Sequence, residues 1–71
     1  MKLIFLEGAN GQVVPINPEI IGHIDEFVEN GIKVLNECQI FTTNGLRLRM
    51  KGGPKEVGHL INKQTEGLHL L

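Results

Sequence analysis

The chain has 71 residues, of which 41% are apolar, 21% are charged and only 4% are aromatic, and its formal net charge is −1. This length predicts one domain with a core barely sufficient for independent stability, so association into an oligomer is a natural way to bury more apolar surface. The small net charge predicts no general attraction to nucleic acid or anionic membranes, and the lack of Trp and Tyr argues against an aromatic platform for single strands. The single cysteine, Cys38, cannot form an internal disulfide, which predicts a reducing, cytoplasmic location.

The N-terminal third predicts a β-hairpin. Residues 2–7 form a nearly continuous apolar run, typical of a covered strand but too short for a signal peptide or a membrane span. We therefore expect no membrane insertion. Asn10-Gly11 predicts a turn into a second strand over 12–17. Pro15 lacks an N–H, so this second strand should lie at an edge or carry a bulge.

Residues 18–30 fit two secondary structures. Asn17 and Pro18 are typical of a helix start. The apolar residues that follow have helical spacing: Ile20, Ile21, Ile24, Phe27 and Val28. A strand is locally the weaker interpretation, so the residue pattern alone favours a helix. The next segment, 28–37, contains another Asn-Gly pair and is expected to include an excursion beyond the central sheet.

Asn44-Gly45 is the clearest local signal, because Asn-Gly is the preferred pair for a two-residue type I′ turn between two strands. Such a turn would pair Phe41 with Leu48 on the core face and Ile40 with Arg49 on the other face. Ile40 would then be partly exposed among cations, which predicts that it belongs to a subunit interface.

The C-terminal third predicts a helix over about 54–64. Pro54 is favoured at the first helical position, and Val57, Leu60 and Ile61 form one apolar face. So short a helix must pack on the sheet to be stable. Residues 65–71 form an apolar tail. We expect its Leu68, Leu70 and Leu71 to dock on the domain or on a neighbouring subunit.

These patterns predict a single β-rich α+β domain over residues 1–71. Its fold is expected to be a small antiparallel sheet or partly closed barrel of four to five strands with a C-terminal helix. The predicted core residues are Leu3, Phe5, Val13, Ile16, Ile24, Phe41, Leu48, Val57, Leu60 and Ile61.

Arg47, Arg49 and Lys51 form a basic row on one strand face, about 6.5–7 Å apart. This spacing suits the phosphates of RNA or DNA, or a small anionic ligand such as a nucleotide. The simpler interpretation is a solvated face, or a strand edge protected against aggregation. The negative net charge and the lack of an aromatic residue within the row favour the simpler interpretation.

The remaining polar residues predict no enzyme and no cofactor. Asp25, Glu26 and Glu29 are expected to form a solvated face, or to meet Arg47 and Arg49 of a neighbouring subunit. The soft metal ligands are His23, His59, His69 and Cys38, and their spacing matches no zinc motif. The sequence contains no phosphate-binding loop, nucleotide fingerprint or nucleophile motif, so we predict no catalytic and no metal-binding residues.

A series of motifs in this chain resembles the small FlbD/SwrD-type proteins of bacterial flagellar systems. The matching segments are Asn10-Gly-Gln-Val-Val-Pro-Ile-Asn-Pro-Glu-Ile-Ile21, Ile24, Thr43-Asn-Gly45, Pro54-Lys-Glu-Val57 and Leu60-Ile61. They cover residues 2–63 in the family's order and mark turns and core. The interval between Ile24 and Thr43 is longer than in the family, which places an insertion within 28–37. The strand before the helix also departs from the family's valine-rich pattern. The resemblance implies a strand over 20–27, and we adopt that prediction.

We therefore predict a non-enzymatic, self-associating interaction or regulatory module of bacterial or phage origin, similar to FlbD/SwrD-type proteins. It would act as a homo-oligomer that docks a protein partner through Ile40 and the leucine tail, framed by Arg47 and Arg49. The alternative is binding of nucleic acid or a small anionic ligand by the row Arg47, Arg49 and Lys51, with the site at an oligomer interface as one variant.

Overall fold

The computed structural model describes residues 2–66, which form five strands and one C-terminal helix. The elements are β1 (Ile4–Glu7), β2 (Val13–Ile16), the 3-10 turn η1 (Pro18–Ile20), β3 (Ile21–Glu29), β4 (Ile32–Thr42), β5 (Arg47–Lys51) and α1 (Pro54–Thr65). The predicted β-rich α+β fold is confirmed. Leu68, Leu70 and Leu71 lie outside the described residues.

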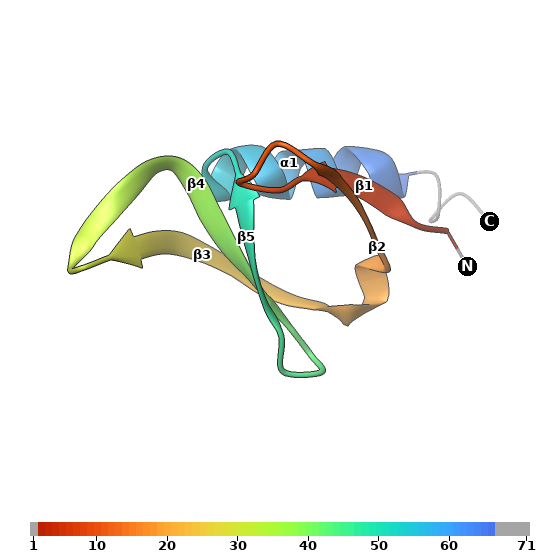
Figure 1. Cartoon of the computed structure of the whole chain (residues 1–71). Helices are drawn as coiled ribbons and strands as arrows, with labels where there is room; N and C mark the ends of the chain where they lie inside the picture. The colour runs from red at the N-terminus through yellow and green to blue at the C-terminus, as the bar shows by residue number, and fades with distance from the viewer. Residues whose placement is uncertain (1, 67–71) are drawn as a thin grey trace.

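The strands form two antiparallel sheets that together make a partly closed barrel. One sheet is β1–β2 and the other is β3–β4–β5. The sheets meet where Gly8 bridges to Met50 and where the Ala9 N–H donates to the Arg49 carbonyl at 3.1 Å. Within residues 2–66 no ladder joins β2 to β3, so the barrel stays open there. Figure 1 shows α1 along one side of the strands, and the β3–β4 hairpin extending past the end of β5.

The ambiguous segment is a strand, as the family resemblance implied. Asn17 does cap a helical start, because its Oδ1 accepts the Glu19 N–H at 3.0 Å, but the helix stops after the single turn η1. From Ile21 onward the chain pairs with β4. Long-range pairing therefore overrides the local helical periodicity.

The turn at residues 42–46 differs from the prediction by one residue. The Thr42 N–H donates to the Leu46 carbonyl, the Gly45 N–H donates to the Thr42 carbonyl, and only Gly45 has positive φ. This geometry is a three-residue loop with a bulge at its glycine. Ile40 consequently pairs with Leu48, and Phe41 pairs with Arg47. The predicted pairing and the predicted exposure of Ile40 are both wrong, since a one-residue shift exchanges the two faces of a strand.

The core consists of seven buried side chains between α1 and the inner faces of both sheets. They are Ile4, Leu6, Ile16, Cys38, Ile40, Met50 and Val57. Of the predicted core, Ile16 and Val57 are confirmed as buried, and Ile24, Leu48 and Ile61 pack against the cluster.

The other predicted core residues are wrong, mainly because an unbroken apolar strand does not reveal which alternate residues face inward. In β1, Ile4 and Leu6 are buried and Phe5 is exposed, as is Leu3 just before the strand. Val13 in the apolar run of β2 is exposed for the same reason. Leu60 is exposed because it lies at the margin of the apolar face of α1. Phe41 is half-buried on the face opposite the core as a result of the shifted turn.

The helix α1 covers the inner face and closes one strand edge. Val57 is buried in its first turn, and Gln64 near its other end hydrogen-bonds the backbone of Phe5 at 2.8 Å in both directions. Gln64 thus occupies the edge of β1 as a neighbouring strand would. No helix within the described chain is long and apolar enough to cross a membrane.

Candidate functional site

The face of β3–β4–β5 that points away from α1 is the candidate site, which we call the open face. Along β4 the core-facing residues Cys38, Ile40 and Thr42 are buried, while Gln39 and Phe41 alternate with them on the open face. Cross-strand pairing then places Arg47, Arg49 and Lys51 of β5 on this same face. The predicted basic row therefore exists as one side of an amphipathic strand.

Two cations of the row already have carboxylate partners in the same chain. The Arg49 Nε lies 2.5 Å from Glu37 Oε1, and its Nη2 lies 3.6 Å from Glu29 Oε2. The Lys51 Nζ lies 3.6 Å from Glu7 Oε2. These pairs lower the positive potential that three adjacent cations would otherwise create, which weakens the case for a chain of phosphates along the strand.

Arg47 differs from its two neighbours, because no ion pair joins it to a carboxylate within residues 2–66. It lines a hollow of about 330 Å³ together with Arg49, Gln39, Phe27 and Val28. A second hollow of about 580 Å³ lies towards the β1–β2 turn, where Gly8 and Asn10 are part of the wall, and the two arginines line it as well. The arginine side chains thus stand between two adjoining concave surfaces.

Aromatic rings do lie among the cations, contrary to the expectation from the strand sequence. Phe27 packs under Arg49, with the guanidinium carbon 4.2 Å from the ring centroid. Phe41, the cross-strand partner of Arg47, stacks on His23 with centroids 4.5 Å apart and an interplanar angle of 12°. The rings come from β3 and β4, so the sequence of β5 alone could not reveal them.

The distal part of the β3–β4 hairpin, residues 27–36, forms a protruding segment that we call the arm. At its tip Asn30 and Gly31 have φ of 53° and 79°, as a two-residue type I′ turn requires. At its base the register shifts beyond Glu26, and Asn36 also has positive φ. The arm is the predicted excursion of residues 28–37, and it bends away from the body on the left of Figure 1.

The arm exposes three large aliphatic side chains. The exposed fractions are 52% for Val28, 71% for Ile32 and 76% for Leu35. Sequence reasoning missed these residues as a surface, although the apolar pattern around the third Asn-Gly pair was a usable signal. The predicted interface residue Ile40, by contrast, is fully buried in the core.

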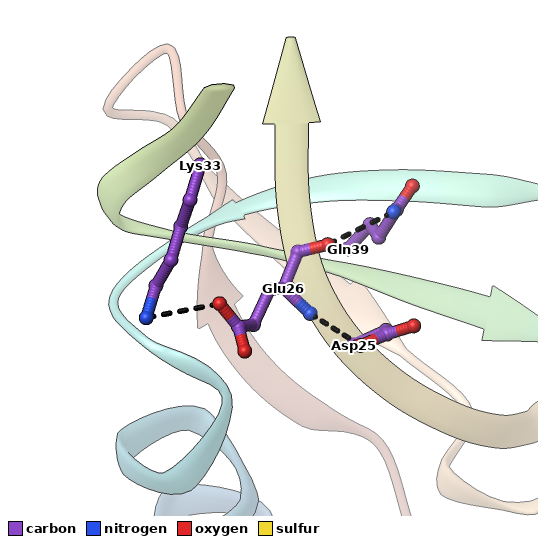
Figure 2. A network of polar contacts seen from close by, with 4 residues as sticks. All are labelled: Asp25, Glu26, Lys33 and Gln39. Atoms are coloured by element: carbon purple, nitrogen blue, oxygen red, sulfur yellow. Dashed lines mark hydrogen bonds and ion pairs between the residues drawn. The ribbon is translucent and has the colours of Figure 1, made fainter. Parts of the chain in front are cut away.

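The predicted acidic cluster is divided among separate partners in the same chain. Figure 2 shows Glu26 bound to Lys33 Nζ at 2.9 Å, while its carbonyl accepts the Gln39 side-chain amide. Asp25 accepts the N–H of Glu26 at 2.8 Å. Glu29 reaches Arg49 of its own chain, so the contact that one of the two interpretations gives to a neighbouring subunit forms here within one chain.

Residues 2–66 contain no group of three His, Cys, Asp or Glu side chains that could hold a metal ion, and His69 lies outside the described residues. Cys38 is a buried free thiol. Burial raises the pKa of the Cys38 thiol, and the nearby Glu56 carboxylate raises this pKa further. Its environment is therefore that of a packed core residue and not of an activated nucleophile.

No protein-family model, curated protein or solved structure matches this chain. The resemblance to FlbD/SwrD-type proteins stays a prediction.

Proposed function

We propose that this protein is a non-enzymatic interaction module that associates with further copies of itself through the arm. The observation that carries the proposal is the exposure of Ile32 and Leu35, at 71% and 76%, on the protruding two-stranded arm. Burying apolar surface contributes about 25 cal/mol per Å², so two such side chains favour association.

The small size of the core supports the same proposal. Within residues 2–66 the buried core cluster has seven side chains, and a domain of this length gains little stability from its core alone. Association through the arm would bury Ile32 and Leu35, which are not part of the core. A regulatory role and a cytoplasmic location belong to this proposal as expectations from the family resemblance and from the free thiol of Cys38.

The test is a mass measurement by sedimentation equilibrium on the full chain and on the double variant Ile32→Asp, Leu35→Asp. The wild-type protein should form a defined oligomer, and the variant should have the monomer mass of 7.9 kDa. Val13→Asp is the matched control, because Val13 is equally exposed but lies on β2, far along the chain from the arm. A wild-type monomer at every concentration, or an oligomer unchanged in the double variant, would contradict the proposal.

A further inference from the structure

We propose that the hollow between Arg47 and Arg49 binds a small nucleotide-type ligand, that is, one phosphate group carried on a planar ring. The hollow has about 330 Å³, within the range of small-ligand sites, and Gln39, Phe27 and Val28 complete its wall. This site is separate from the exposed tip of the arm.

The two arginines supply the anion-binding half of the site. Arg47 has no carboxylate partner within the described chain, so its guanidinium is available for an oxyanion. Arg49 is fixed by Glu37 at 2.5 Å, whereas its contact with Glu29 is looser at 3.6 Å. A ligand phosphate can therefore take the place of Glu29 and leave the closer pair intact. Guanidinium groups bind phosphate through paired, charge-assisted hydrogen bonds.

The β3 and β4 residues that line the same hollow supply apolar and hydrogen-bonding groups for a ring. Phe27 and Val28 line it with apolar surface. The Gln39 side-chain amide donates to the Glu26 carbonyl at 3.0 Å, which holds it in place and leaves its oxygen as an acceptor for a ring N–H. An anion alone would leave these groups unused, so the ligand should carry both parts.

Charge decides between a small ligand and a long polyanion. Lys51 is paired with Glu7, Arg49 is paired with two glutamates, and the whole chain has a net charge of −1. Affinity for a polynucleotide depends on neutralising many phosphates. Among the described residues of the basic row, only Arg47 has no carboxylate partner, so this face suits a ligand with a single phosphate.

The experiment is a titration of the isotope-labelled full chain with adenosine 5′-monophosphate, followed by NMR. We expect saturable shifts of the Arg47 side-chain N–H, the Gln39 amide and the Phe27 ring. Adenosine without phosphate and inorganic phosphate without the ring should each bind at least about tenfold more weakly, since tenfold corresponds to about 1.4 kcal/mol and each lacks one half of the contacts. Absence of shifts at these groups, or equal binding of inorganic phosphate, would overturn the proposal.

Variants test the assignment of the site. Arg47→Gln should weaken binding about tenfold or more, because it removes a charge-assisted contact, while Lys51→Gln on the same face should leave binding within about twofold. Equal effects of the two variants would overturn the assignment. A decanucleotide that binds more tightly than the mononucleotide, with a steep salt dependence, would also overturn it in favour of nucleic acid. The variant Ile32→Asp, Leu35→Asp should bind normally, so this proposal stands or falls independently of self-association.

Discussion

Strands β3 and β4 run through both the arm and the body, by which we mean the described residues outside the arm, but the two regions are stabilised in different ways. Ile40 and Ile32 both belong to β4, yet Ile40 is fully buried and Ile32 is 71% exposed. The difference is what packs on each side chain: Ile40 belongs to the buried core cluster together with residues of β1 and α1, whereas Ile32 lies outside that cluster. An apolar residue in a strand is therefore a core residue only where another element covers its face.

Polar contacts take the place of a core in the arm. Glu29 is held by Arg49, Lys33 by Glu26, and the Asn36 carbonyl by the N–H of Gly52 at 2.6 Å. Exposed ion pairs contribute about 0–1 kcal/mol each. The body should therefore resist unfolding cooperatively, whereas the arm should open first.

The largest difference between the two regions should appear when the same residue type is truncated in each. Ile40→Ala should lower the free energy of unfolding by about 2–5 kcal/mol, because it leaves a cavity in a fully packed core. Ile32→Ala should change it by less than about 0.5 kcal/mol when the protein is monomeric, since exposed side chains lose little on truncation. Urea unfolding at low protein concentration measures both values. Similar losses would show that the arm is packed in solution.

A smaller loss should follow from adding a methyl group where β3 and β4 approach closely in the body. A Cβ on Gly22 would lie 2.9 Å from the Phe41 carbonyl oxygen, at the register shift between Ile21 and His23. Gly22→Ala should therefore cost about 1–3 kcal/mol, the usual range for overpacking. Gly58→Ala in α1 is the control, because its added Cβ meets only the Ile24 Cδ1, at 4.0 Å, and Ala is favoured over Gly within a helix. Equal thermal midpoints for the two variants would contradict this account.

The predictable parts of this fold were those that depend on local chemistry. Asn-Gly pairs indicated the turns, Pro54 indicated the start of α1, and alternation placed Leu48 and Met50 on the inner face of β5. Which alternate residues of a strand face the core was not predictable where every residue is apolar, as in most of β1. The pairing of Ile40 depended on one additional loop residue, which the sequence Asn-Gly does not specify.

The candidate site was predictable only in its β5 component. Arg47 and Arg49 are two residues apart in an alternating strand, so the sequence predicts that they share a face. Phe27 and Gln39 join them through cross-strand pairing, and Glu29 reaches Arg49 across the arm. Such contacts between distant residues depend on register, including the shift beyond Glu26, which a single sequence does not reveal.

The edge of β1 is protected by a side chain of α1. Gln64 both donates to and accepts from the backbone of Phe5. Gln64→Ala should cost about 1–2 kcal/mol, as two hydrogen bonds to an exposed edge are exchanged for water. Gln64→Glu should recover part of this loss at neutral pH, because a carboxylate still accepts the Phe5 N–H but cannot donate. Chemical denaturation of the wild-type protein and the two variants measures their free energies of unfolding. Equal values for all three would contradict a protective role of Gln64 at the edge of β1.

The smallest effect on global stability should come from Arg49, although its local effect should be clear. Its side chain is 42% exposed and joins the arm to β5 through Glu29 and the Phe27 ring. Arg49 also pairs with Glu37 of β4. Arg49→Met should lower the free energy of unfolding by no more than about 1 kcal/mol, since these interactions lie at the protein surface. Amide hydrogen exchange should nevertheless become faster in the arm, at Val28 and Lys33, and stay unchanged at Ile40. Lys51→Met provides the control, because Lys51 contacts Glu7 in the body, so arm exchange should not respond to it. Uniform acceleration over body and arm after Arg49→Met would mean that the two regions open as one cooperative unit, and the distinction between a packed body and a tethered arm would then fail.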